Sequence, residues 1–256
     1  MKYSAASYLW VAVLALVMAA CEAPAQGRPP RMERNPVGVI FQDPIDDRAV
    51  DALEAELRPG DRLLIDSSSG QLDAALRLGQ IVVERNIHVT VNGNCSSVCA
   101  LYVFLPARTK DVPRGTWVWF DVSPYAWNRV FESRPDLFSD QERSEFAQHF
   151  QQYEALLAQG GASASLLDCV DVALGLDMTK ARREFQISPG TVGRNLIIPS
   201  RFQSVALSRD VLESFGASIE GDYWWPTSER ERRSVNEAHD TRVVWVDRLE
   251  QCAGAF

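Results

Sequence analysis

The chain has 256 residues and a formal net charge of −8, with the apolar and charged fractions of an ordinary globular protein. This acidic balance speaks against nucleic acid or an anionic membrane surface as a partner. The sequence contains no phosphate-binding Walker loop, no Gly-x-Gly-x-x-Gly and no His-Glu-x-x-His. We therefore expect no cofactor and no metal.

The N-terminal residues 1–21 are predicted to be a signal peptide. Tyr8–Ala20 is an apolar stretch of signal-peptide length, too short for a comfortable membrane span. Met18–Cys21 resembles a lipobox, after which Cys21 would carry the lipid anchor. The alternative is ordinary cleavage before Gln26, after the small-residue pattern Ala23–Ala25. We favour the lipobox, which predicts a lipoprotein on the periplasmic side of a bacterial cell envelope, with the lipid as its only membrane contact.

The five cysteines agree with export. If Cys21 is lipidated, Cys95, Cys99, Cys169 and Cys252 remain, an even set suited to disulfides in an oxidising compartment. Four cysteines allow three pairings. Cys95 and Cys99 are close enough in sequence to bridge across a turn, and a Cys169–Cys252 bond would tie the C-terminal tail to a helix. A zinc site at Cys-x₃-Cys is the alternative, which the export signal disfavours.

The first half of the mature chain alternates strands with helices. Residues 22–36, rich in Pro, Arg and Gly, predict a flexible tether; residues 37–222 form the predicted domain and residues 223–256 a helical extension. The predicted elements are a strand at Val37–Phe41, a helix at Asp46–Leu57, a strand at Leu63–Ile65, a polar turn at Asp66–Gly70 and a helix at Leu72–Val83. This alternation predicts an α/β fold with a parallel sheet.

A second strand–turn–helix unit follows. Ile87–Val91 is β-branched and alternating, Asn92–Asn94 is typical of a turn, and Val98–Leu105 predicts a mostly buried helix. Ser96 and Ser97 therefore lie at a strand-to-helix elbow, where free backbone N–H groups can stabilise an oxyanion. The simpler interpretation is that one serine only caps the helix.

The remaining elements are less regular. We predict a strand at Trp117–Phe120, an irregular aromatic stretch at Tyr125–Leu137, a capping-box helix at Ser139–Ala158, a helix at Ser163–Leu174, a loop at Ser188–Gly190, a strand at Ser204–Leu207, a helix at Ser208–Phe215 and a helix from Ser228 to about Leu249. Trp117, Trp119 and Trp127 are interpreted as core or interface aromatics; the alternative is that they reshape a pocket.

Three short motifs follow one another between Leu63 and Pro124. They are Ser67-Ser68-Ser69-Gly70, Cys95-Ser96-Ser97-Val98-Cys99 and Trp119-Phe120-Asp121, and a strand-and-helix segment follows later at Val205–Gly216. Together they resemble the Clp-protease-like branch of the Clp/crotonase fold, in particular its secreted bacterial members. The resemblance covers roughly residues 37–219. It implies repeated ββα and βαβ units, with helices around a mainly parallel sheet.

The resemblance also implies site residues. Ser97 matches the nucleophile, and the backbone N–H groups of Val98 and Gly70 match the oxyanion donors. Asp121 stands where the family has its histidine, and Asp171 lies in the region of the third acid. Relatives of this fold often form rings or trimers, which suggests a homo-oligomer by analogy.

The aspartate at position 121 is the most important departure. A serine hydroxyl is a poor nucleophile unless a base takes its proton, and a carboxylate near its reference pKa of about 4 is a weak base. Of the chain's histidines, His149 is the best replacement because its helix could fold over a cleft, whereas His88 is expected to pack on its strand and His239 to be solvated.

Two functions from different classes follow. The first is a catalytically impaired envelope protein, a binding or assembly module that grips an extended peptide or an envelope protein. The alternative is a serine hydrolase or peptidase in which Ser97 works with a non-standard base, either Asp121 or His149.

Overall fold

The structure is a computed structural model that describes residues 29–188 and 191–252. The predicted signal peptide, the lipobox and Cys21 therefore lie outside the described residues. Within the described ranges, no helix is both long enough and apolar enough to cross a membrane.

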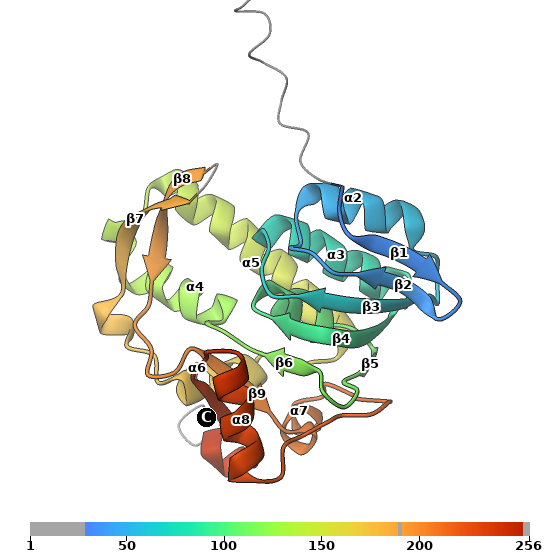
Figure 1. The fold of residues 1–256 in the computed structure, drawn as a ribbon. Helices are drawn as coiled ribbons and strands as arrows, with labels where there is room; N and C mark the ends of the chain where they lie inside the picture. The colour runs from blue at the N-terminus through green and yellow to red at the C-terminus, as the bar shows by residue number, and fades with distance from the viewer. Residues whose placement is uncertain (1–28, 189–190, 253–256) are drawn as a thin grey trace, which may run out of the picture.

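A six-stranded, mainly parallel sheet forms the centre of the molecule (Figure 1). Its strands are β1 (Met32–Asn35), β2 (Gly38–Phe41), β3 (Arg62–Ser67), β4 (His88–Ser96), β5 (Thr109–Asp111) and β6 (Trp117–Trp119). The order is β1-β2-β3-β4-β5, and β6 also pairs with β4. Within this sheet β1 and β2 pair antiparallel and the other pairs are parallel. The predicted α/β class with a mainly parallel sheet is confirmed.

Helices pack together on one side of this sheet (Figure 1). They are α2 (Asp47–Glu56), α3 (Leu72–Glu84), α5 (Asp140–Gly160) and the π-helix η1 (Cys99–Phe104). Side-chain caps begin two of them: Asp46 accepts from the Ala49 N–H at 2.8 Å, and Ser139 forms the predicted capping box with Glu142. The apolar faces of these helices and the buried β2–β4 strands form the main core.

A separate layer covers the carboxyl ends of the strands. It consists of α4 (Pro124–Ser133), the 3₁₀ turns η2 (Pro135–Leu137) and η3 (Met178–Lys180), and an antiparallel hairpin of β7 (Arg182–Ser188) and β8 (Thr191–Ile197) (Figure 1). Leu196 of this hairpin packs against a small cluster that contains Ala126 and Val130 of α4. The hairpin and α4 are therefore one packed unit.

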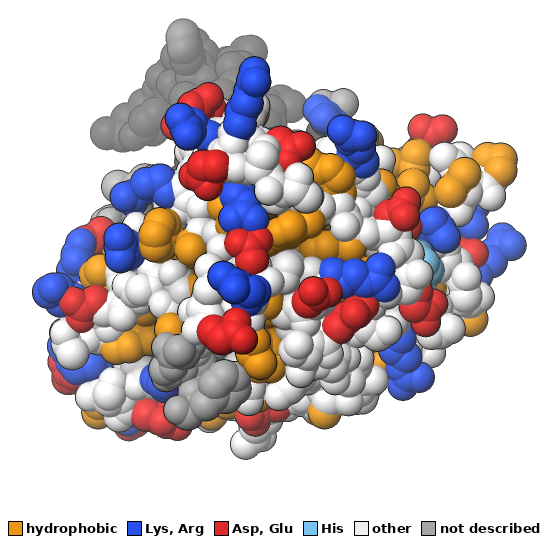
Figure 2. All heavy atoms as spheres, turned by 90° about the horizontal axis from the view of Figure 1, so that it is seen from below, with side chains coloured by type: hydrophobic (Ala, Val, Ile, Leu, Met, Phe, Trp, Pro, Cys, Tyr) orange, Lys and Arg blue, Asp and Glu red, His pale blue; other side chains and the backbone are white. Residues whose placement is uncertain are grey.

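A further group of elements, mostly from the C-terminal part of the chain, packs below β6 in Figure 1. It contains α6 (Ser165–Leu174), β9 (Ser204–Leu207), α7 (Arg209–Ser214), α8 (Glu229–Ala238), β10 (Val243–Val246) and the 3₁₀ turn η4 (Leu249–Cys252). Strands β9 and β10 pair in parallel, and a bridge between Phe120 and Val205 joins them to the main sheet. The face seen from below carries both signs of charge, with hydrophobic side chains between them (Figure 2).

Several predicted elements differ from the structure. The predicted flexible tether 22–36 extends too far, because its last residues include strand β1, Met32–Asn35, which pairs with β2. The predicted turn Asn92–Asn94 lies inside β4, because Gly93, at φ 142°, lets the strand pass close to the Asp66 carboxyl. The predicted irregular stretch 125–137 is largely helix α4, which Ser123 caps by accepting from the Ala126 N–H.

The C-terminal half contains two further corrections. The predicted loop 188–190 connects β7 to β8, a hairpin that the sequence interpretation missed; residues 189–190 lie outside the described residues. The predicted helix from Ser228 ends at Ala238, and its supposed continuation is strand β10. The segment 223–256 is therefore more than a helical extension, because β10 completes the pairing of β9.

Candidate functional site

Ser97 follows the last residue of β4 in a left-handed backbone conformation, with φ 55°. Such a conformation is unfavourable for a residue with a side chain and persists only where the surrounding structure enforces it. The helix that follows begins after Val98 without a side-chain cap, so a serine cap is not observed here. Strained serines at strand-to-helix turns are a known way to present a nucleophile.

A disulfide between Cys95 and Cys99 spans this elbow, with their Cα atoms 5.2 Å apart. A second disulfide joins Cys169 to Cys252 over a sequence separation of 83 residues. The structure thus brings together all four cysteines in the pairing that the spacing suggested. Bonded sulfurs leave no thiolate for zinc, and within the described ranges no group of three or more His, Cys, Asp and Glu could hold a metal ion.

The helix after the elbow is a buried π-helix, η1. The Leu105 N–H donates to the Ala100 carbonyl, five residues earlier, at 2.9 Å. Single π turns are rare and are found frequently at functional sites. Here the wider turn accompanies the Cys95–Cys99 bond, and it places Val98, Leu101 and Tyr102 along one cavity.

Asp121 lies beside Ser97. Its carboxyl accepts a hydrogen bond from the Ser204 hydroxyl at 2.9 Å, and both Ser97 and Asp121 line one cavity. Burial raises the pKa of Asp121, while the hydroxyls of Ser204 and Ser97 act in the opposite direction. The neutral carboxyl is thus favoured relative to a solvated aspartate.

A cavity of about 290 Å³ contains this pair and is called the Ser97 cavity below. It is lined by Leu72, Ser97, Val98, Leu101, Tyr102, Asp121, Val122, Pro124, Trp127, Leu196, Ile197 and Ile198. A larger hollow of about 570 Å³, the outer chamber, shares Leu72, Trp127, Leu196 and Ile197 with it. The two spaces are therefore adjacent, separated by side chains of α3, α4 and β8.

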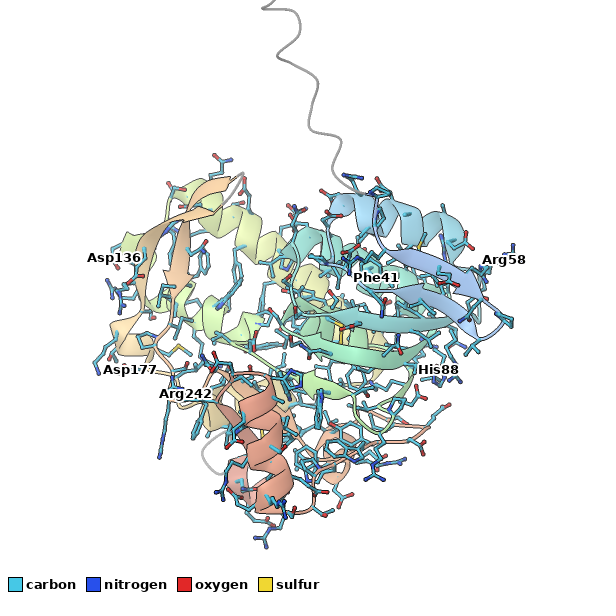
Figure 3. The ribbon with its side chains drawn as sticks, in the orientation of Figure 1. Phe41, Arg58, His88, Asp136, Asp177 and Arg242 are labelled. Carbon is cyan, nitrogen blue, oxygen red and sulfur yellow. A yellow bond between two sulfur atoms is a disulfide. The ribbon has the colours of Figure 1, made fainter. Side chains whose placement is uncertain are left out.

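Two of the three histidines, His88 and His239, are absent from the described lining of the Ser97 cavity. His88 begins β4 (Figure 3), so the strand alone separates it from Ser97 by roughly 25 Å, and its Nε2 lies 3.1 Å from Asp111 Oδ1. The ring of His239 packs edge-on against Trp119, with ring centroids 5.0 Å apart. Neither imidazole is placed to take a proton from Ser97.

The third histidine, His149, is buried in α5 and lines the outer chamber. Its Nε2 lies 2.9 Å from the Tyr102 hydroxyl and its Nδ1 lies 2.9 Å from Asp73 Oδ1. Since both ring nitrogens have these partners, His149 does not serve Ser97 directly. Asp121 is the one carboxyl that shares the cavity with Ser97 among the described lining residues, and its role as a base stays a prediction.

Asp171 is buried and holds the start of α4. It accepts from the Ser123 hydroxyl at 2.6 Å, from the Ser123 N–H at 3.1 Å and from Arg129 at 2.7 Å. Burial raises the pKa of Asp171 to about 6. Its contact is thus with Ser123, two residues after Asp121, and its role as a third acid stays a prediction.

The oxyanion roles also stay predictions. Val98 lines the Ser97 cavity. Gly70 lies in a bridge with Ile45, where an added Cβ would come within 2.5 Å of the Ile45 carbonyl oxygen. Glycine is therefore required for this close backbone approach, whatever its chemical role.

Four tryptophans form a cluster beside Trp119, away from the Ser97 cavity. They are Trp117, Trp224, Trp225 and Trp245. Trp117 and Trp119 are thus core aromatics, as interpreted, whereas Trp127 reaches the cavity.

The sequence interpretation missed three contributors to the site. Ser204 carried no recognisable signal. The β8 residues Leu196 and Ile197 belong to the missed hairpin. Tyr102 was visible as the lone hydroxyl of an apolar run, and that contrast could have indicated a buried polar group.

No family model and no curated protein matches the sequence. Among solved structures, the chain is similar to a ClpP1 mutant from Listeria monocytogenes, with 13% sequence identity and a TM-score of 0.30. The matched region covers 48% of this chain and 70% of that chain.

Proposed function

We propose that the chain is an exported envelope protein with a Clp-protease-like domain that binds an extended peptide or envelope protein at the Ser97 cavity and hydrolyses it poorly or not at all. One observation carries this proposal: Ser97 shares its cavity with the Asp121 carboxyl, and no histidine of the described residues lines that cavity. Burial raises the pKa of Asp121, and whatever fraction of this carboxyl is neutral cannot accept the serine proton.

The walls of the cavity support binding. Most of its lining side chains are apolar, and its volume of about 290 Å³ suits one large side chain of a ligand. The adjoining outer chamber would take the neighbouring residues of the same extended segment.

A second candidate function is serine hydrolysis with Asp121 as the base. The left-handed Ser97 backbone and the buried Asp121 carboxyl in the same cavity favour this candidate. When ionised, a carboxylate with a raised pKa is a stronger base than a solvated one, so the two candidates differ in how much of Asp121 is charged at the working pH.

Labelling with a fluorophosphonate probe separates them. The lipid-free domain from Gln26 onward would be compared with Ser97→Ala and Asp121→Asn, each checked for folding by circular dichroism. We expect little labelling of the wild type and increased labelling in Asp121→His, which supplies an imidazole. Strong wild-type labelling that is lost in Ser97→Ala and in Asp121→Asn would replace the binding proposal with the hydrolase.

Binding is tested separately with fluorescein-labelled casein peptides, measured by anisotropy. Trp127→Ala removes a wall of the cavity, and Trp225→Ala is the matched control in the tryptophan cluster. Weakened binding in the first variant alone supports the proposal. Equal binding by all three proteins, or none by the wild type, contradicts it.

The envelope location rests on the lipobox. Wild-type protein in bacterial cells should incorporate radioactive palmitate and sediment with membranes, and Cys21→Ser should lose both properties. Export of an unlipidated protein in both cases would instead favour cleavage before Gln26.

A further inference from the structure

Among the described residues that line the Ser97 cavity, Tyr102 is the one phenol. It lies in η1 and is only 1% exposed. Burial raises the pKa of Tyr102, so the hydroxyl keeps its proton at all ordinary pH values. A buried phenol has one proton to donate and lone pairs that accept, and the direction of each bond depends on its partner.

That partner is His149, whose Nε2 lies 2.9 Å from the Tyr102 oxygen. The other ring nitrogen, Nδ1, lies 2.9 Å from a carboxylate oxygen of Asp73. A carboxylate can only accept a hydrogen bond, so Nδ1 carries the proton of the neutral ring. Nε2 of neutral His149 is then an acceptor, and Tyr102 must donate to it.

Gain of a second proton by His149 reverses this bond. Nε2 then carries a hydrogen and donates to the Tyr102 oxygen. The Tyr102 proton stays on its oxygen but no longer bonds to His149, so it can be donated to another acceptor. When His149 is neutral, the Tyr102 proton is used in the bond to His149, so the hydroxyl can only accept a hydrogen bond from another group. When His149 is charged, the Tyr102 proton is free, so the hydroxyl can donate a hydrogen bond to another group.

We propose that Tyr102 is a specificity-determining residue of the Ser97 cavity, and that His149 decides whether it accepts a hydrogen bond from the occupant or donates one to it. Neutral His149 selects an apolar group that carries an N–H or O–H donor. Protonated His149 selects an apolar group that carries a carbonyl or another acceptor. This inference rests on the proposed function, because it assigns ligand chemistry to the same cavity.

Other ionisable groups surround His149 and enter the test. Asp73 faces it from α3, and Tyr102 from η1. The outer chamber that it lines also contains Glu142, Glu145 and Arg183. Tyr153, one turn further along α5, packs against the Tyr102 ring with centroids 4.6 Å apart. In the Ser97 cavity itself, Asp121 is a second group that can titrate.

Two probes of similar size distinguish the directions of the bond: indole, which only donates, and acetophenone, which only accepts. Their affinities for the full domain would be measured by calorimetry or ligand NMR between pH 5 and pH 8, the range in which imidazoles titrate. We expect acetophenone to bind about three- to tenfold more tightly at the acidic end and indole to weaken by a similar factor, the worth of one hydrogen bond.

Three variants assign the effect. Tyr102→Phe and His149→Gln should each remove the opposite pH dependence while leaving an apolar cavity. Asp121→Asn should retain it, which separates His149 from the other titrating group. Parallel pH dependence of the two probes in the wild type would overturn the inference, as would opposite dependence that survives in Tyr102→Phe.

A ligand-free measurement keeps this inference distinct from the binding proposal. The His149 ring would be titrated by NMR in wild type and in Tyr102→Phe. A shifted midpoint in the variant shows the coupling, and an unchanged midpoint overturns the inference. If the midpoint shifts but neither probe binds, the hydrogen-bond relay stands and the assigned specificity is overturned, whereas the cavity-binding function is decided by the casein-peptide measurement with Trp127→Ala.

Discussion

Ser97 and Asp121 line the same cavity, although the serine follows β4 and the aspartate follows β6. These two strands pair in parallel, with Ser96 opposite Trp119. Residues that leave two paired parallel strands emerge at the same edge of the sheet, which is why they meet. The groups around this edge and the disulfides should govern how stability varies with pH and with substitution.

Asp121→Asn should change stability in a pH-dependent way. Burial raises the folded-state pKa of Asp121, so the folded protein holds this proton more tightly than the unfolded chain. The stability that Asp121 contributes by holding this proton is therefore present at acidic pH and is lost as the pH rises through the folded-state pKa. We expect the free energy of unfolding of the variant, measured in urea, to increase relative to that of the wild type as the pH is raised from acidic to neutral. A constant difference across this range would contradict the raised pKa.

Asp171 permits a sharper pH window, because burial raises its pKa to about 6. Its unfolded value is about 4, so its contribution should be lost as pH rises from about 4 to 6 and above. Asp171→Asn should flatten this part of the stability profile. Asp171→Ala removes the acceptor of Ser123 and should cost about 2–3 kcal/mol already at pH 4. Equal effects of both variants would show that the carboxyl does not hold Ser123.

Lys110 is fully buried and donates to the Leu105 carbonyl at 2.7 Å. Burial lowers the pKa of this lysine to about 7. The unfolded chain therefore binds more protons than the folded chain between pH 7 and about 10, and stability should rise with pH in that window. Lys110→Met should stabilise the protein by roughly 1–4 kcal/mol at pH 6, with the gain shrinking toward pH 10. Urea midpoints at both pH values check this, and a destabilised variant at pH 6 would contradict it.

The two disulfides should differ in what they stabilise. The Cys169–Cys252 bond closes a loop with a sequence separation of 83 residues, whereas Cys95 and Cys99 are separated by 4. Loop-closure entropy gives about 4.5 kcal/mol for the long loop and about 2 kcal/mol for the short one. Thermal unfolding of Cys252→Ala and Cys99→Ala should reproduce this order.

The short disulfide should matter more for the site. Without it, the elbow can relax from the left-handed conformation of Ser97, and probe binding in the Ser97 cavity should weaken in Cys99→Ala more than in Cys252→Ala. If Cys252→Ala weakens both stability and probe binding more than Cys99→Ala does, the Cys95–Cys99 bond only stabilises the fold and has no specific role in the cavity.

Features that depend on near neighbours in the chain could be predicted from the amino-acid sequence. Alternating strands and helices predicted the α/β class, Ser139 and Glu142 predicted a capped helix, and the Cys95–Cys99 motif after a β-branched run predicted the strand-to-helix elbow at Ser97. These features depend on backbone hydrogen bonds and on the spacing of apolar residues over short segments. Both can be read from neighbouring residues in the sequence.

Which side chains meet across the molecule is set by tertiary packing. The hydrogen bond of Ser204 to Asp121 joins residues 83 positions apart, and that of His149 to Asp73 joins residues 76 positions apart. No local pattern encodes such a pair, because its geometry follows from sheet order and helix packing. The hairpin of β7 and β8 was missed for the same reason: it acquires its role by packing against α4 and lining the cavity, not from its own sequence.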